Sequence, residues 1–244
     1  MFVPCAENVN DLDFSGFTLI LPAVSIGNVG QLATDLTISS LSSSRHLIGY
    51  LHDASILPVV GNDAFARLGH EKGELNLSAE VYQSTEKRLV IVQQRAPISK
   101  GHYANYCQKL LAWIKRCSFK QVVLLSSISA TDRVDAQLQG SPLRYMTTSV
   151  SQQLSSSFDK LSWVQLEKRP KFPDMTKESD ELQFYLPGGG VTKRFFDRCE
   201  KEDVPLAVLM TFCSEGDNIA DAVSLFLYLN DWLEITNKDT VGVN

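Results

Sequence analysis

Two glycine-containing stretches hold the residues of this sequence that most resemble a phosphate-binding site. Residues 25–30 join a predicted strand to a predicted helix, which is where phosphate-binding loops lie in nucleotide-binding α/β proteins. The dinucleotide-binding motif needs three glycines in the pattern GxGxxG, and only Gly27 and Gly30 are present. We therefore favour a tight turn, in which glycine permits backbone angles that other residues resist, over a nucleotide site.

The second stretch is the run of three glycines from Gly188 to Gly190, followed by Lys193. Successive glycine N–H groups can converge on an anion, and a nearby lysine would add positive charge. The spacing nevertheless differs from the GxxxxGK[ST] pattern of a phosphate-binding loop. Here too we favour the conformational explanation, a tight turn before a helix.

The remaining chemistry-bearing residue types form no catalytic signature. Residues 214–218 contain acidic side chains, but Ser214 or Asp217 is better explained as the N-cap of the last predicted helix. No HExxH zinc motif and no GxSxG nucleophile motif occurs. The four histidines, which belong to no such motif, are His46, His52, His70 and His102. The pattern favours a binding protein over an enzyme, with no catalytic, cofactor-binding or metal-binding residues.

The cysteines indicate reduced thiols. Their number is odd, their spacing is wide and no CxxC pair occurs, which argues against a disulfide framework and against structural zinc. They are Cys5, Cys107, Cys117, Cys199 and Cys213. The N-terminal residues contain neither a basic region nor a long apolar run, so we expect no signal peptide and a cytoplasmic and nuclear protein.

Composition excludes two classes of partner. The 244 residues have a formal net charge of -5 and are 44% hydrophobic and 21% charged, as is usual for a globular protein. Lysine and arginine form no unbroken basic stretch, so neither nucleic acid nor an anionic membrane is expected as a partner. No apolar window is long enough to span a membrane.

Hydrophobic periodicity predicts an α/β fold. A helix followed by a buried strand occurs twice, which predicts a mostly parallel sheet with helices packed on it. Alternation of apolar and polar residues over 75–82, followed by 88–95, predicts an antiparallel hairpin. Further strands are predicted at 17–23, 56–60, 121–126, 182–186 and 205–212, and helices at 28–44, 103–115, 192–202 and 217–235.

The chain is expected to form a single domain over residues 1–244, because the same pattern resumes after each irregular segment. Polar, proline-containing or glycine-containing composition predicts surface loops at 131–142 and 166–181. Residues 236–244 are predicted to form a polar tail.

The last predicted helix is apolar around most of its circumference. One apolar stripe is ordinary for a helix, but further apolar residues cover much of the rest and must be covered on more than one side. Two arrangements would do this: the helix lies deep in its own core, or its outer face packs against another chain. For the second arrangement we predict as partner-binding residues Phe226, Tyr228, Leu229 and Trp232.

Several stretches, taken in order over almost the whole chain, are similar to one known family. They are MFVPC, GFTLILPAVSIGNVGQLATDL, AEVYQ, QKLLAWIK, VVLLSS, SPLRYMTT, LPGGGVTK and AVLMTFCSEGDNIADAVSLFLYLNDWLEI. The sequence thereby resembles the proteasome assembly chaperone family. The resemblance implies a three-layer α/β fold with helices on both faces of the sheet.

The resemblance also implies a function. Such a chaperone would form a heterodimer with proteasome assembly chaperone 1, bind α-subunits of the proteasome core particle, guide them into a seven-membered ring and hinder off-pathway association of α-rings. The family is not enzymatic. Some assembly chaperones end in a hydrophobic tail that enters pockets on the α-ring, whereas the last residues here are polar. Either this is a shortened form, or ring binding rests on the folded body and the partner chain.

A different class of function stays open from the residues alone. A small-molecule enzyme on a nucleoside-phosphorylase-like or Rossmann-like scaffold would use the glycine junctions to hold phosphate. A deep pocket with converging polar groups at either junction would favour that enzyme.

Overall fold

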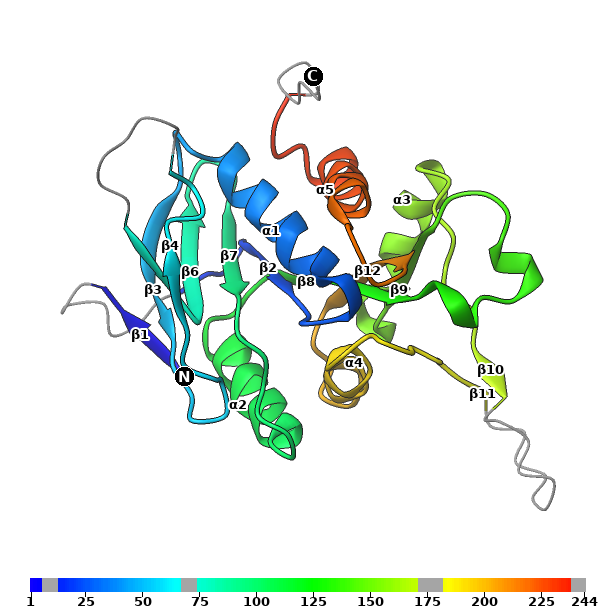
Figure 1. Ribbon diagram of the computed structural model, residues 1–244, viewed down its shortest axis with the longest axis horizontal. Helices are drawn as coiled ribbons and strands as arrows, with labels where there is room; N and C mark the ends of the chain where they lie inside the picture. The colour runs from blue at the N-terminus through cyan, green and yellow to red at the C-terminus, as the bar shows by residue number, and fades with distance from the viewer. Residues whose placement is uncertain (6–12, 67–73, 171–181, 238–244) are drawn as a thin grey trace.

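The computed structural model describes residues 1–5, 13–66, 74–170 and 182–237. Its centre is an eight-stranded sheet with the strand order β1-β3-β6-β7-β2-β8-β12-β9 (Figure 1). The strands of this sheet are β1 (Phe2–Pro4), β2 (Thr18–Pro22), β3 (His46–Leu51), β6 (Ala79–Ser84), β7 (Leu89–Gln94), β8 (Gln121–Ser129), β9 (Leu143–Thr147) and β12 (Leu206–Cys213). Two small sheets pair β4 (Val60–Asn62) with β5 (Leu75–Leu77) and β10 (Arg169–Pro170) with β11 (Leu182–Gln183).

Four adjacent central strands, β7, β2, β8 and β12, run parallel, and the strands that flank them pair in the antiparallel sense. Every residue of β12 is buried, as expected for a parallel strand covered on both faces. The predicted fold class is confirmed: a mostly parallel central sheet, helices on both faces, and a hairpin formed by β6 and β7.

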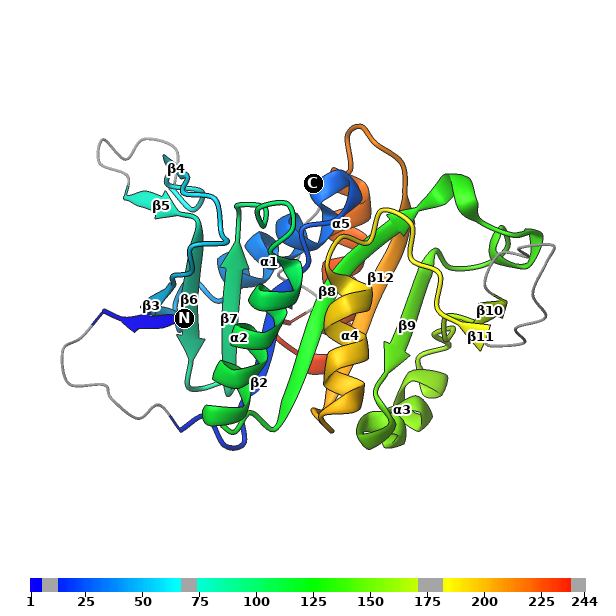
Figure 2. The same cartoon turned by 90° about the horizontal axis from the view of Figure 1, so that it is seen from below.

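The helices form two layers, one on each face of the sheet (Figures 1 and 2). One layer contains α1 and α5, and the other contains α2 and α4. The helix bounds are α1 (Val29–Ser40), α2 (Tyr103–Arg116), α3 (Ser155–Lys160), α4 (Thr192–Lys201) and α5 (Ile219–Leu233). Alternate side chains of β8 enter the two cores, with Val122 and Leu124 on the α2 side and Val123 and Leu125 on the α1 side.

The predicted helices and most predicted strands are present, with ends shifted by a few residues. Helix α2 buries the face that the sequence indicated, including Tyr106, Leu110, Trp113 and Ile114. The strand predicted at 182–186 is shorter, since β11 contains two residues. Four strands, β1, β3, β9 and the two-residue β10, are absent from the sequence prediction, and β10 lies within the loop predicted at 166–181.

The prediction of a strand at 56–60 is wrong. Ile56 forms an isolated bridge with Ile98, and β4 begins only at Val60. The Ser78 side chain replaces a strand ladder there, because its hydroxyl accepts from the Val59 N–H at 2.8 Å and donates to the Leu57 carbonyl at 2.9 Å. Ser78 also divides the strand predicted at 75–82 into β5 and β6.

The predicted loops and tail are only partly described. Residues 131–142 contain the end of one short 3₁₀ turn, Ala130–Asp132, and all of another, Asp135–Gln137. Of the loop predicted at 166–181, residues 171–181 lie outside the described residues, and so do residues 238–244 of the predicted tail. The single-domain boundaries stay a prediction.

The two glycine junctions pack directly against each other. The Ile26 N–H donates to the Gly188 carbonyl at 2.8 Å, and the Ser129 N–H donates to the Pro187 carbonyl at 2.8 Å. Gly190 has a φ of +58°, and a Cβ at this position would lie 2.0 Å from the Val24 carbonyl oxygen. These glycines are therefore required by backbone conformation and by close backbone approach, as the conformational explanation predicted.

We expect Gly190→Ala to lower the free energy of unfolding by at least about 2 kcal/mol, because the new methyl group adds a backbone clash to the cost of a left-handed residue. Urea unfolding followed by circular dichroism measures this loss. The matched control is Gly140→Ala, whose φ is +79° but whose Cβ would meet no atom within 4 Å. The control isolates the backbone cost, about 1 kcal/mol. Equal losses in both variants would contradict the close-packing explanation.

An ion pair ties the end of β3 to α2. The Lys109 Nζ lies 2.6 Å from the Asp53 Oδ2, and the Asp53 side chain is 4% exposed. Burial would raise the pKa of the Asp53 carboxyl, but hydrogen bonds from Lys109 and Ser55 outweigh burial and lower that pKa to about 2. A carboxyl whose folded pKa is depressed stabilises the fold above its unfolded pKa, and this stabilisation disappears as the pH falls through the folded pKa.

We expect Asp53→Asn to lower the free energy of unfolding at pH 7 by about 2 kcal/mol. The difference from the wild type should shrink as the pH falls from about 4 toward 2. Urea unfolding at a series of pH values measures both effects. In the control Lys115→Met, which removes the more exposed pair with Glu202, the loss should stay below about 0.5 kcal/mol. A pH-independent difference for Asp53→Asn would show that the charge is not responsible.

Candidate functional site

The predicted partner-binding residues of α5 divide into two pairs. Phe226 is 2% exposed and Leu229 is 0% exposed, so both belong to the chain's own core between α5 and the sheet. Tyr228 and Trp232 are partly buried and pack at the edge of that core. The part of the prediction that concerns direct contact with a partner therefore rests on Tyr228 and Trp232.

An aromatic cluster fixes the position of these two side chains. We define the cluster as Tyr145, Phe158, Trp163, Tyr228 and Trp232. The Trp232 ring lies edge-on to Phe158 with 4.8 Å between ring centroids, and Tyr228 lies edge-on to Trp163 at 6.1 Å. The Tyr228 hydroxyl is 2.9 Å from the Ser141 hydroxyl. Edge-to-face contacts of this kind add stability beyond the area they bury, so these rings are pre-organised before any partner arrives.

Next to the aromatic cluster, α5 presents residues to the outside. Leu227 is 36% exposed and Asp231 is exposed, and both lie one residue before a member of the cluster. The outward surface of α5 thus combines an aliphatic side chain, two partly exposed aromatic rings and a carboxylate. Aromatic residues of this kind are enriched in protein interfaces.

The glycine junctions offer little room for a phosphate group. A Cβ added to Gly27 would lie 2.6 Å from the Asn218 side chain, and a Cβ added to Gly30 would lie 2.4 Å from the Leu125 carbonyl oxygen. The hydroxyl groups nearby are paired within the protein: Ser25 with Ser127 at 2.7 Å, and Ser126 with Thr192 at 2.7 Å. These internal contacts use the space and the hydroxyl groups that a bound phosphate group would need.

Residues 214–218 serve the start of α5. Asn218 is the N-cap residue, and Asp217 accepts a hydrogen bond from the Ile219 N–H at 3.1 Å. The acidic side chain thus satisfies one backbone donor of the first turn, close to the capping role that the sequence indicated. The N-cap position itself is one residue later than predicted.

The buried cysteines have the environment of inert thiols. All five cysteines are free, and four are buried. Burial raises the pKa of Cys107 to about 11 and that of Cys199 to about 12. Since the thiolate is the nucleophilic form, these side chains are neutral and unreactive near neutral pH.

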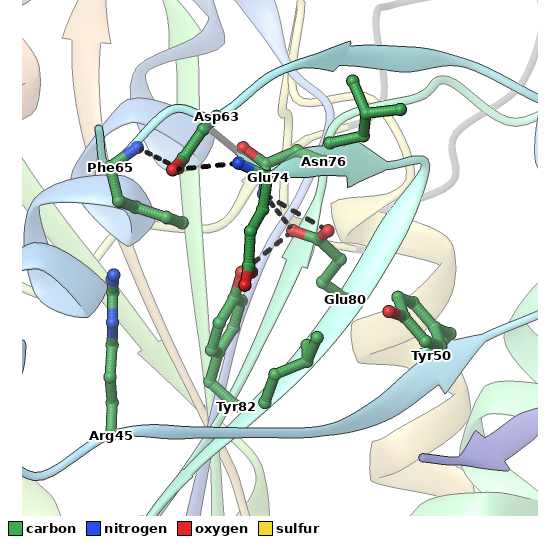
Figure 3. Close-up of a pocket in the computed structure, with 10 residues that line it drawn as sticks. Arg45, Tyr50, Asp63, Phe65, Glu74, Asn76, Glu80 and Tyr82 are labelled. Atoms are coloured by element: carbon green, nitrogen blue, oxygen red, sulfur yellow. Dashed lines mark hydrogen bonds between the residues drawn. The ribbon is translucent and has the colours of Figure 1, made fainter. Parts of the chain in front are cut away.

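A cavity of about 240 Å³ lies beside β3, β5 and β6 (Figure 3). Glu80 in its wall is 1% exposed and accepts hydrogen bonds from the Leu77 N–H at 2.9 Å, the Asn76 amide at 3.0 Å and the Tyr82 hydroxyl at 3.0 Å. Neutral donors thus surround a buried carboxylate. Burial, together with the Glu80 charge, raises the pKa of Tyr82 above its usual value.

This cavity is not predicted by any sequence motif described above. Its lining residues are Arg45, Leu47, Tyr50, Asp63, Phe65, Glu74, Leu75, Asn76, Glu80 and Tyr82. The only local signal was the polar residues that alternate with leucine in β5 and β6, and that alternation is typical of an ordinary half-buried strand. Over the parts of the chain that are described, no three His, Cys, Asp or Glu side chains are grouped to hold a metal ion.

None of the helices within the described residues combines the length and the apolar character needed to cross a membrane.

Comparison with known sequences identifies the family. The sequence model of the PAC2 family matches residues 19–236. A relative from Danio rerio named proteasome assembly chaperone 2 is 44% identical over 243 residues, covering 99% of this chain and 91% of the relative. A Homo sapiens relative of the same name is 42% identical over 236 residues, covering 96% of this chain and 87% of the relative.

Solved structures share the fold at low sequence identity. The structure of Pyrococcus furiosus PbaA, described as an archaeal homolog of proteasome-assembly chaperone, has a TM-score of 0.66 at 12% identity and covers 98% of this chain and 85% of that one. Pyrococcus furiosus PbaB, described as an archaeal proteasome activator, has a TM-score of 0.63 at 13% identity and covers 98% and 91% of the two chains. These likenesses show the fold. The family model and the sequence matches over nearly the full length show that the chain belongs to the PAC2 family of proteasome assembly chaperones.

Proposed function

We propose that this chain promotes assembly of the proteasome core particle as a heterodimer with proteasome assembly chaperone 1. The heterodimer binds α-subunits, guides them into a ring and hinders off-pathway association of α-rings. It acts in the cytoplasm and the nucleus, and it is not an enzyme. The observation that carries this proposal is the identity of 41–44% with relatives named proteasome assembly chaperone 2, each aligned with at least 96% of this chain.

Two features support binding over catalysis. The glycine junctions, where a Rossmann-like enzyme would hold phosphate, are filled by backbone and by the Asn218 side chain. The thiols of Cys107 and Cys199, which a covalent mechanism would need as thiolates, have raised pKa values.

The partner-binding role of α5 is part of the proposal. Tyr228 and Trp232 are held rigidly by the aromatic cluster and remain partly exposed, and Leu227 lies beside them. Rigid aromatic side chains gain contact area at a small loss of conformational entropy, which suits them to anchor a partner. Phe226 and Leu229 support this surface from beneath, since both are buried against the sheet.

The function is tested by co-expressing the chain with proteasome assembly chaperone 1 and sizing the purified product by light scattering, with and without purified α-subunits. A one-to-one heterodimer that captures α-subunits supports the proposal. A monomer that binds neither protein contradicts it.

We expect Leu227→Asp to weaken binding to proteasome assembly chaperone 1 by at least about tenfold, because it places a charge at the proposed contact. The double variant Tyr228→Asp with Trp232→Asp should weaken it further. Isothermal titration calorimetry measures the affinity, and near-ultraviolet circular dichroism reports whether the aromatic cluster is intact.

The matched control for this prediction is Ile219→Asp. Ile219 is 61% exposed in the first turn of the same helix. A carboxylate at this position is stabilised by the positive end of the helix dipole. The affinity of this variant should stay within about twofold of the wild type. Unchanged binding by a folded Leu227→Asp variant would remove α5 from the interface.

A further inference from the structure

The β4–β5 ribbon and the residues just before β4 expose an unusual share of the large apolar side chains. Within the described residues, 14 large hydrophobic side chains are exposed, and five of them lie between positions 57 and 77. They are Leu57 (43%), Val59 (44%), Val60 (63%), Leu75 (67%) and Leu77 (40%). Scattered single apolar residues are normal on a protein surface, whereas a gathering of this kind indicates an interaction site.

Strand register shows that this exposure is built into the ribbon. Val60 lies opposite Leu77, and residues two apart in a strand share a face, so Val60, Leu75 and Leu77 point to the same side. Asn76 points to the other side, is 5% exposed and donates to the Glu80 carboxylate at 3.0 Å. The polar residue thus points inward and the leucines point outward. A ribbon that contacts only water is expected to have the opposite arrangement.

The cavity adjoins this apolar face, since Leu75 belongs to both. Three carboxylates line the cavity, those of Asp63, Glu74 and Glu80, against the single guanidinium group of Arg45. Over the described residues, none of the three carboxylates forms an ion pair. The excess of negative charge is complementary to a basic group supplied from outside.

Arg45 is held in the wall of the cavity by an aromatic ring. Its guanidinium carbon lies 4.2 Å from the centroid of the Phe65 ring, a cation–π arrangement, and its Nη1 atom is buried without a hydrogen-bond partner among the described residues. The Nη1 atom of the guanidinium group is thus enclosed within the protein and out of reach of an incoming ligand. The exposed apolar face and the acidic cavity together fit a peptide segment that offers an aliphatic side chain next to a basic side chain.

We propose that the β4–β5 ribbon and its cavity dock a segment of a proteasome α-subunit in which an aliphatic side chain lies next to a lysine or an arginine. The aliphatic side chain covers Leu75 and Leu77, and the basic side chain enters the cavity toward the exposed carboxylate of Glu74. This inference rests on the proposed function for the identity of the occupant. The type of side chains that the occupant must offer follows from the residues of the ribbon and the cavity alone.

The location of the ribbon suits a second interface. It is attached to β6, three strands away from β8 in the sheet, while α5 packs against α1 and β12 (Figure 1). The surface assigned to proteasome assembly chaperone 1 and the ribbon are therefore separate, and one chain can contact both proteins simultaneously.

The first experiment uses the purified heterodimer and measures its affinity for purified α-subunits by biolayer interferometry. Leu75→Asp with Leu77→Asp should weaken α-subunit binding by at least about tenfold and leave heterodimer formation unchanged. Glu74→Lys should weaken it at low salt, with a difference that shrinks as salt screens the charge. Both Leu75 and Glu74 are exposed, so these substitutions leave the core untouched.

The matched control is Leu138→Asp, an exposed leucine (57%) in a different loop, whose α-subunit affinity should stay within about twofold of the wild type. Wild-type affinity in the ribbon variants would overturn the proposal, and so would loss of the heterodimer, because the ribbon would then bind the other chaperone. A wild-type heterodimer that captures no α-subunit would instead overturn the proposed function.

A second experiment identifies the occupant directly. A photo-crosslinking benzoylphenylalanine in place of Leu75 should attach to an α-subunit peptide, located by mass spectrometry, that carries a lysine or an arginine within a few residues of the attachment point. The same group in place of Leu138 should not attach to that peptide. Attachment to proteasome assembly chaperone 1, or to an α-subunit peptide without a basic residue nearby, would contradict the proposal.

Discussion

The arrangement of the two helical layers depends on a backbone contact between the loops at 24–28 and 187–191. The first loop leads into α1 on one face of the sheet, and the second leads into α4 on the other face. Gly190 lies against the Val24 carbonyl, and the Ile26 N–H donates to the Gly188 carbonyl. Because backbone meets backbone there, the starting points of α1 and α4 are fixed relative to each other. In many α/β proteins the same edge of the sheet holds a ligand.

Because these two loops pack against each other, the surfaces proposed for partner binding lie elsewhere, on α5 and on the β4–β5 ribbon. On one face, α5 is held by the sheet beneath it and by the aromatic cluster at its side, so that Tyr228 and Trp232 keep fixed orientations. At the other end of the sheet, the Asn76–Glu80 hydrogen bond holds the β4–β5 ribbon with its leucines outward. Both surfaces are thus held by internal contacts before binding, and such pre-organisation reduces the entropy lost on association.

Periodic sequence patterns predicted the centre of the fold well. The strands β8 and β12 and the helix α2 have continuous apolar runs or a clear helical period, and their burial follows directly from those patterns. Long-range contacts decided the remaining features. Asn76 is buried because Glu80 accepts its hydrogen bond, so the alternation in β5 has the opposite sense to the usual one. The apolar circumference of α5 fitted two arrangements, and only the packed structure shows that Phe226 and Leu229 lie in the core.

The outer edges of the sheet have a consequence for self-association. At one edge, β1 has three residues and ends in Pro4, which has no N–H to offer a further strand. At the other edge, Tyr145 in β9 already exchanges hydrogen bonds with Val164 and Leu166. Neither edge is a good template for adding strands from another copy, the usual route to edge-to-edge aggregation. The protein can therefore expose leucines on the β4–β5 ribbon while the edges of its central sheet offer little opportunity for strand pairing with another copy.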